Sequence, residues 1–162
     1  MSLQDKLDAF KADFEAGKPP YNVSPSVIET MHRATAELIA SGAAQKALKA
    51  GDPAPAFTLN DHEGHLVSSI ELLRQGPLVV TFYRGVWCPY CNMELQALQA
   101  AQPDIRAAGA HLVAISPQLA ANSRKSVRQN ALTFPILSDP HNDVAAQFGL
   151  RLWRPGQTAP YA

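Results

Sequence analysis

Hydrophobic positions along the first 50 residues follow a helical pattern. In residues 3–16 the apolar side chains recur at spacings of four, three and four, which is typical of an amphipathic helix. A second helix is expected from Ser24 and Pro25, because serine caps helices and proline suits the first helical position. A short alanine-rich helix follows, up to about residue 50. We therefore expect an N-terminal helical extension over residues 1–50, packed on the rest of the chain or on another subunit. The apolar positions of its two longer helices are Leu3, Leu7, Phe10, Phe14, Val27, Ile28, Met31, Leu38 and Ile39.

From residue 51 onward, short apolar and β-branched runs alternate with helical patterns. The helix expected after Cys91 joins two apolar strands, so this part predicts a right-handed βαβ unit with parallel strands. Pro103 is expected to kink or end that helix, because it removes one backbone hydrogen bond. The fold class is therefore α/β. Expected strands are 57–59, 65–67, 78–83, 111–116 and 134–137, and expected helices are a short one capped by Ser68 or Ser69, then 92–101, 120–130 and 142–149.

Composition narrows the function classes. The 14 basic and 14 acidic side chains balance, which gives no electrostatic case for nucleic acid or an anionic membrane as a partner. No apolar run reaches the roughly 18 residues of a membrane span, and the first residues do not resemble a signal peptide. We therefore expect a cytoplasmic protein without a membrane partner. Thiols stay reduced in the cytoplasm, which favours a catalytic pair of cysteines over a structural one.

The two cysteines of the chain, Cys88 and Cys91, are two residues apart between a predicted strand and a predicted helix. In that context the spacing indicates a redox motif. Backbone N–H groups at a helix N-terminus stabilise an anion, so a thiol placed there loses its proton more easily. Pro89 suits the first helical turn. Cys88 lies nearer the helix end, and we expect it to be the more exposed thiol and the first to be alkylated.

Two other interpretations of the cysteine pair remain open. Half of a zinc site would need two further ligands, but no second cysteine pair exists and the histidines are scattered without paired spacing. Two buried structural cysteines are the other alternative. We expect redox use, with no metal and no cofactor. The scattered histidines are His32, His62, His65, His111 and His141.

Several stretches resemble the peroxiredoxins of the alkyl-hydroperoxide-reductase type. Gly51-Asp52-Pro53-Ala54-Pro55-Ala56-Phe57-Thr58-Leu59 is similar to the opening signature of that family. Phe82-Tyr83 before the cysteine loop, Phe134 to Asp139, and Val144 to Gly149 match it in order and spacing. The resemblance covers residues 51–149 and implies a thioredoxin-like fold, a central mixed sheet flanked by helices. The predicted organisation is then the extension 1–50 followed by a peroxiredoxin-like domain over residues 51–162.

The resemblance also implies roles for the residues of the loop. In the family motif the cysteine that attacks peroxide corresponds to Cys91, while Cys88 occupies a Thr or Ser position and Arg84 a Pro position. The pair Trp87-Cys88 resembles thioredoxin, and Cys88-Pro89-Tyr90-Cys91 is similar to the glutaredoxin tetrapeptide, in which the first cysteine attacks. The candidate catalytic residues are therefore Cys88 and Cys91. The candidate active-site loop comprises Arg84, Trp87, Pro89 and Tyr90.

The function implied is that of a thiol-dependent antioxidant oxidoreductase, which reduces hydroperoxides through a Cys88/Cys91 dithiol–disulfide cycle. A thioredoxin- or glutathione-type reductant would regenerate the dithiol. One alternative is a thioredoxin- or glutaredoxin-like thiol–disulfide oxidoreductase that acts on disulfide substrates without peroxidase activity. A second alternative is a redox-inactive interaction module that uses the N-terminal helices for assembly.

A last expectation concerns the C-terminal end of the domain. The fold implied by the resemblance continues past the last matched helix with two antiparallel strands and a final helix, but only 13 residues follow Gly149. We therefore expect a domain that lacks the C-terminal hairpin and helix, with an open sheet edge at strand 78–83. Such an edge favours pairing with a second copy in a homodimer. The alternative is that the N-terminal helices or the tail over residues 150–162 fold over the edge and cover it.

Overall fold

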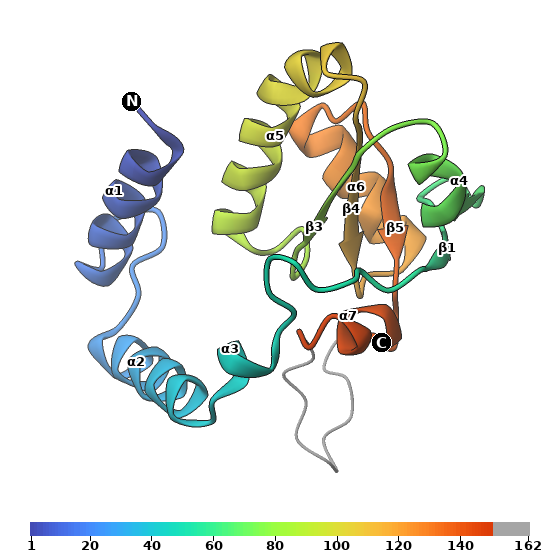
Figure 1. Cartoon of the computed structure of the whole chain (residues 1–162). Coiled ribbons are helices and arrows are strands. Elements are labelled where there is room, and N and C mark those ends of the chain that lie inside the picture. The colour runs from blue at the N-terminus through green and yellow to red at the C-terminus, as the bar shows by residue number, and fades with distance from the viewer. Residues whose placement is uncertain (151–162) are drawn as a thin grey trace. The chain divides into compact units, whose positions relative to one another are not determined.

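The computed structural model describes residues 1–150. The chain forms two compact units, Met1–Ala47 and the part from Leu48 onward (Figure 1). The sequence pattern placed the boundary between residues 50 and 51.

The first unit contains three helices, α1 (Leu3–Glu15), α2 (Pro25–Ala40) and α3 (Ala43–Lys46). Ser2 and Asp5 form a capping box at the start of α1, which satisfies two backbone N–H groups there. The helix α3 is shorter than the alanine-rich stretch predicts. None of the three helices contains a buried residue, so the amphipathic pattern produces helices in this unit but no core among its own residues.

The second unit is built on a parallel sheet of three strands in the order β3 (Leu78–Phe82), β4 (His111–Ser116), β5 (Ile136–Ser138). The helix α5 (Pro89–Ala107) connects β3 to β4, and α6 (Ala120–Asn130) connects β4 to β5 (Figure 1). The predicted parallel βαβ unit is confirmed. The structure therefore brings the carboxyl ends of β3 and β4 to the same edge of the sheet.

A β-hairpin completes the sheet region. The strands β1 (Thr58–Asn60) and β2 (Leu66–Ser68) pair antiparallel, and α4 (Ser69–Leu73) follows them, with Ser68 as its N-cap. One antiparallel bridge, between Asp61 and Leu137, joins the hairpin to β5. The last described helix is α7 (Asp143–Gln147). Within residues 1–150, the antiparallel part of the predicted mixed sheet thus comes from this hairpin and its bridge.

Buried side chains fill both faces of the parallel sheet. Alternate residues of β4 point to opposite faces, so Leu112 and Ala114 belong to one cluster while Val113 and Ile115 belong to another. The first cluster packs against α5 and α6. The second lies against the hairpin, α4 and α7. Because both faces of the sheet are covered by other elements, consecutive side chains of β4 can all be apolar, and the middle of the strand is a continuous apolar run in the sequence.

The helix α5 does not end at Pro103, contrary to one of the two outcomes expected for that proline. Pro103 lies inside the helix, which continues to Ala107. Leu98 and Ile105, one on each side of the proline, pack against the buried cluster on this face. Tertiary packing therefore offsets the backbone hydrogen bond that the proline removes.

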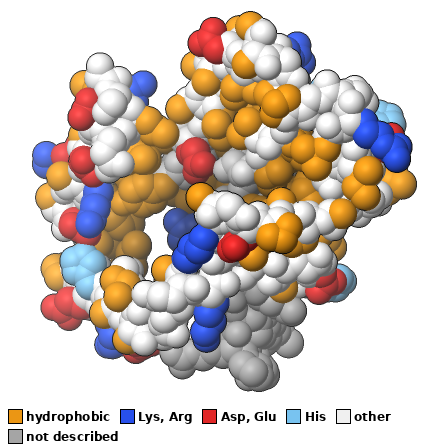
Figure 2. Space-filling model, in the orientation of Figure 1, with side chains coloured by type: hydrophobic (Ala, Val, Ile, Leu, Met, Phe, Trp, Pro, Cys, Tyr) orange, Lys and Arg blue, Asp and Glu red, His pale blue; other side chains and the backbone are white. Residues whose placement is uncertain are grey.

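Within the described residues, β3 pairs with β4 alone, so its other edge has no strand partner there, as expected. The expectation of a missing C-terminal hairpin and helix concerns residues 151–162, which lie outside the described part of the chain. On the face shown in Figure 2, acidic and basic side chains are interspersed. Across residues 1–150, no helix combines the length and the apolar character that crossing a membrane requires.

Candidate active site

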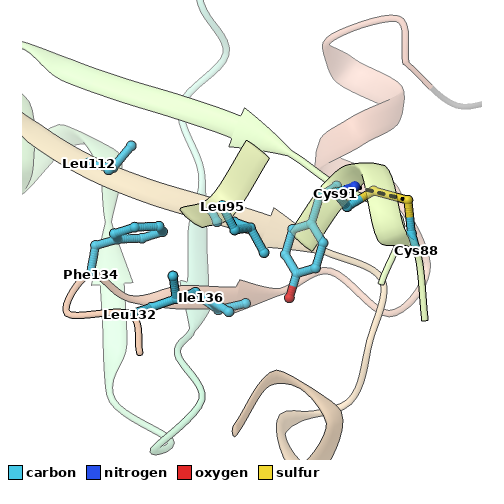
Figure 3. Close-up of a cluster of buried hydrophobic side chains, with 9 residues drawn as sticks. Cys88, Cys91, Leu95, Leu112, Leu132, Phe134 and Ile136 are labelled. Atoms are coloured by element: carbon cyan, nitrogen blue, oxygen red, sulfur yellow. Dashed lines mark hydrogen bonds between the residues drawn. A yellow bond between two sulfur atoms is a disulfide. The ribbon is translucent and has the colours of Figure 1, made fainter. Parts of the chain in front are cut away.

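The loop between β3 and α5 places both cysteines at the beginning of the helix. Cys88 is the N-cap residue, with extended backbone angles, and Pro89 occupies the first helical position. Cys91 lies within the first turn, and its Cα is 5.3 Å from that of Cys88. The two sulfurs form a disulfide (Figure 3). The sequence-based prediction of a strand, a Cys-Pro-Tyr-Cys turn and a helix therefore describes the local structure correctly.

Two donors point at the sulfur of Cys88. The backbone N–H of Cys91 and the Nη2 of Arg84 each lie 3.2 Å from Cys88 Sγ. The guanidinium of Arg84 is also stacked over the ring of Trp87, 5.4 Å from its centroid. A negative charge on this sulfur would be stabilised by the helix N-terminus and by a cation. Arg84 is exposed, yet it is a partner of the cysteine rather than a charge that only contacts solvent.

In the disulfide form the two cysteine residues do not follow the order of exposure expected for the thiols. Cys88 is 0% exposed in the disulfide form, and Cys91 is 8% exposed. The N-cap side chain turns back over the first turn to accept the Cys91 N–H, and Arg84 lies against it. Its position at the N-cap therefore gives Cys88 two hydrogen-bond donors, but it does not make Cys88 the more solvent-exposed residue. The order of alkylation stays a prediction.

The other residues of the loop differ in how far they are buried beside the cysteines. Trp87 is half exposed, whereas Tyr90 is partly buried and packs against the cluster that contains both cysteines. Gly85 has a φ of +155°, and a Cβ there would lie 2.6 Å from Nε1 of Trp87. Glycine is therefore required where the loop passes beneath the tryptophan.

Sequence reasoning missed the polar residues that hold this loop. Gln118 is buried, and its Oε1 accepts the N–H of Val86 at 2.8 Å. On the other side of the same residue, Nδ2 of Asn92 donates to the Val86 carbonyl oxygen at 2.8 Å. Gln118 comes two residues after β4, and the cysteine loop follows β3. The shared carboxyl edge of adjacent parallel strands is the signal that could have paired them.

A buried hydroxyl cluster lies beneath Gln118. Tyr83 is 5% exposed, its Oη donates to Ser126 Oγ at 3.2 Å, and Nε2 of Gln118 donates to that Oη at 3.0 Å. Burial raises the pKa of the Tyr83 phenol above its usual 10.0, against the opposing effect of its hydrogen bonds with Ser126 and other nearby polar side chains. The phenol is therefore a neutral hydrogen-bonding group throughout the physiological pH range.

The structure does not gather a set of metal ligands in the part that it describes. No group of three or more His, Cys, Asp or Glu side chains is arranged to hold a metal ion among residues 1–150. The features assembled around the disulfide are therefore two sulfurs, one guanidinium, and backbone and amide donors. Such a set can stabilise a thiolate and close a disulfide within one helical turn.

The chain is similar in sequence to proteins that carry peroxiredoxin names. A Mycobacterium tuberculosis protein with a peroxiredoxin name is 35% identical over 102 residues, which cover 63% of this chain and 64% of that protein. Peroxiredoxin Bcp of Escherichia coli K12 is 32% identical over 103 residues, which cover 64% of this chain and 65% of Bcp. The chain thus spans less than two thirds of the length of each of these relatives.

The fold of the chain is also similar to that of solved peroxiredoxin structures. The crystal structure of peroxidoxin BcpB from Mycobacterium tuberculosis matches with a TM-score of 0.64 at 30% identity, covering 68% of this chain and 71% of BcpB. Peroxiredoxin Q of Xanthomonas campestris, at 22% identity and a TM-score of 0.52, supports the fold alone. The AhpC/TSA family model matches residues 50–160. With a thioredoxin-like sheet, a disulfide-bonded cysteine pair at the start of α5 and this match over most of its length, the chain belongs to the AhpC/TSA family.

Proposed function

We propose that this protein is a thiol-dependent peroxidase that reduces hydroperoxides through a dithiol–disulfide cycle of Cys88 and Cys91. The observation that carries the proposal is the disulfide itself, closed within the first turn of α5 with Arg84 against one of its sulfurs. Membership of the AhpC/TSA family and the peroxiredoxin names of its relatives support the peroxide as substrate.

The cycle has three steps: oxidation of one cysteine by the peroxide, closure of the disulfide, and reduction of the disulfide. The thiolate of one cysteine attacks an oxygen of the peroxide, so that the O–O bond breaks, an S–O bond forms and the leaving oxygen departs as an alcohol or water after it takes a proton. The resulting sulfenic acid is attacked by the second cysteine, which forms the disulfide and releases water. The disulfide is then reduced by thiol–disulfide exchange, either by one external dithiol, which becomes a disulfide, or by two molecules of a monothiol, which leave joined as a disulfide.

We assign the attack to Cys88 and the resolving step to Cys91. Cys88 Sγ accepts hydrogen bonds from Arg84 and from the Cys91 N–H, and it caps a helix of 19 residues. These donors stabilise its thiolate more than that of Cys91, for which no such set of donors is seen among the described residues. The family motif, laid on this chain, assigns the attack to Cys91 instead. Single-cysteine variants distinguish the two assignments.

The reductant that fits this cycle is a thioredoxin- or glutathione-type thiol. Both kinds of reductant maintain the cytoplasm in a reduced state, so we propose that the protein works there. Exchange would begin at Cys91, because it is the less buried of the two residues and because a stabilised Cys88 thiolate is the better leaving group.

We also propose that two copies of the chain pair in solution. The support is the edge of β3, which has no second strand partner within residues 1–150 and carries the exposed Val79. Unpaired apolar edges favour pairing with another chain. Light scattering after size-exclusion chromatography tests the pairing, and a monomer at high protein concentration would contradict it.

The decisive experiment measures hydrogen peroxide and an organic hydroperoxide as substrates, with a thioredoxin system as reductant. We expect peroxide-dependent oxidation of the reductant that disappears when both cysteines are replaced by serine. Reduction of insulin disulfides by the same sample is the comparison assay. Insulin reduction without peroxide consumption would replace the proposal by a thiol–disulfide oxidoreductase, and inactivity in both assays would favour an interaction module.

A further inference from the structure

Two side-chain amides hydrogen-bond to the backbone of Val86 in the cysteine loop, one to its N–H and one to its carbonyl oxygen. Its N–H donates to Oε1 of Gln118, and its carbonyl oxygen accepts from Nδ2 of Asn92, each at 2.8 Å. Gln118 belongs to the segment after β4, whereas Asn92 belongs to the first turns of α5. Val86 lies two residues before Cys88, so this pair of amides fixes the backbone that leads directly into the N-cap.

Both amides are anchored in turn by other buried groups. Nε2 of Gln118 donates to the Tyr83 hydroxyl at 3.0 Å, and the Gln118 backbone N–H donates to Ser116 Oγ at 3.3 Å. On the helix side, Oδ1 of Asn92 accepts from Nδ2 of Asn130 at 2.9 Å. The position of each amide is therefore set by the sheet and by α6 rather than by the loop.

We infer that Gln118 is a positioning residue of the redox pair, and that it acts through the Val86 peptide. By holding this peptide in one place, Gln118 keeps the two thiols at the separation from which the disulfide closes without unwinding the start of α5. The inference rests on the proposed dithiol–disulfide cycle and adds to it the residue that makes ring closure efficient.

The physical reason is preorganisation. Two thiols form a disulfide more readily when the chain already holds them in the bonded geometry, because less conformational freedom is lost on closure. A loop released from Gln118 would leave the partly buried Val86 N–H without its acceptor and allow the N-cap to move. The reduced form would then gain freedom that the disulfide form does not have, so the disulfide would become easier to reduce.

The experiment compares Gln118→Met with Gln99→Met in the full-length chain. Both substitutions replace a glutamine whose Oε1 accepts a backbone N–H at 2.8 Å, but Gln99 accepts that of Thr133, far along α5 from the cysteines. The equilibrium between dithiol and disulfide is measured in glutathione buffers at fixed pH. We expect Gln118→Met to lower the equilibrium constant for disulfide formation about tenfold, and Gln99→Met to leave it within about twofold.

A second variant keeps the inference testable if Gln118→Met does not fold. Tyr83→Phe keeps the buried ring and removes only the hydroxyl that orients the Gln118 amide. We expect a shift in the same direction, about threefold. Amide hydrogen exchange provides an independent measure, in which the Val86 N–H should be protected in the oxidised and the reduced protein alike.

The outcomes separate this inference from the proposed function. The glutathione equilibrium does not require peroxide, so a wild-type protein without peroxidase activity would overturn the function and still permit the comparison of variants. An unchanged equilibrium constant in folded Gln118→Met overturns the role of Gln118. Equal shifts in Gln118→Met and Gln99→Met would also overturn it, since they would show a general loss of stability.

Discussion

The N-terminal and C-terminal halves of α5 lie beside similar glutamine contacts, but they differ in charge and in the chemistry they can support. At the beginning of the helix, Gln118 accepts the N–H of Val86, and just past the middle of the helix Gln99 accepts that of Thr133. The first bond joins the cysteine loop to the segment after β4, and the second joins α5 to the loop before β5. The beginning also has two sulfurs and the positive end of the helix dipole, while the far end has neither.

The charged residues near each end show what the difference means. Arg84 lies beside the N-terminus of α5 and contacts Cys88, whereas Arg106 lies in the last turn, where a cation complements the negative end of the dipole. Arg106 therefore suits its end of the helix, whereas Arg84 lies at the end that disfavours a cation, where it would stabilise a thiolate of Cys88 in the reduced protein. The comparison predicts that substitutions at the beginning alter reactivity and that those at the far end alter stability.

Replacement of either cysteine should have the largest effect. We expect Cys88→Ser and Cys91→Ser each to abolish multiple turnovers, because neither variant can close the disulfide. In Cys91→Ser, peroxide should still convert Cys88 into a sulfenic acid, which a dimedone-type reagent and mass spectrometry would detect. Sulfenic acid formed on Cys91 in Cys88→Ser, with none on Cys88 in the converse variant, would reverse the assignment.

A core substitution at the far end should change stability without changing the thiols. Phe134 is 2% exposed and lies at the opposite end of the buried cluster from Cys88 (Figure 3). We expect Phe134→Ala to lower the free energy of unfolding by about 3–5 kcal/mol, as measured by denaturant titration. Leu73→Ala, at an exposed position, is the control and should change it by less than about 0.5 kcal/mol. An altered rate of thiol alkylation in folded Phe134→Ala would contradict the prediction that substitutions far from the cysteines change stability alone.

The two arginines give the most direct contrast. We expect Arg84→Gln to slow alkylation of Cys88 at pH 7 about tenfold, because the thiolate loses a cationic donor. The matched substitution Arg106→Gln should leave the alkylation rate unchanged and lower stability by about 0.3–1 kcal/mol. The measurement is mass-tagged alkylation of the reduced protein at graded pH, with the modified cysteine identified. Equal rates in both variants would show that Arg84 does not act on the sulfur.

The smallest effect concerns Tyr83 at high pH. Burial raises the pKa of this phenol in the folded state, while in the unfolded chain it ionises near the usual 10.0. The neutral phenol therefore contributes stability that is fully present below about pH 10 and is lost as the pH rises through the folded pKa. Denaturant melts between pH 8 and 11 should show this loss in the wild type. The loss should be smaller in Tyr83→Phe, and an identical alkaline profile in both proteins would contradict the prediction.

The elements of the second unit could largely be predicted from local patterns. The strands at Leu78–Phe82 and His111–Ser116, and the helix Ala120–Asn130, match their predicted ranges closely. Periodicity succeeds there because both faces of the sheet are covered by the same chain. In the first unit the same kind of pattern predicts the helices, but it does not specify which surface their apolar residues contact. Val27, Met31 and Ile39 are exposed in the structure.

The sequence by itself determined the cysteine pair and its position at a helix N-terminus, because spacing, Pro89 and the flanking strand are local features. Only the tertiary structure decided which cysteine is more buried and which groups contact it. Arg84 could have extended into solvent, and Gln118 is 30 residues from Cys88 in the sequence. Local rules operate over a few residues of chain, whereas these contacts depend on the parallel pairing of β3 with β4, which brings their carboxyl ends to one edge.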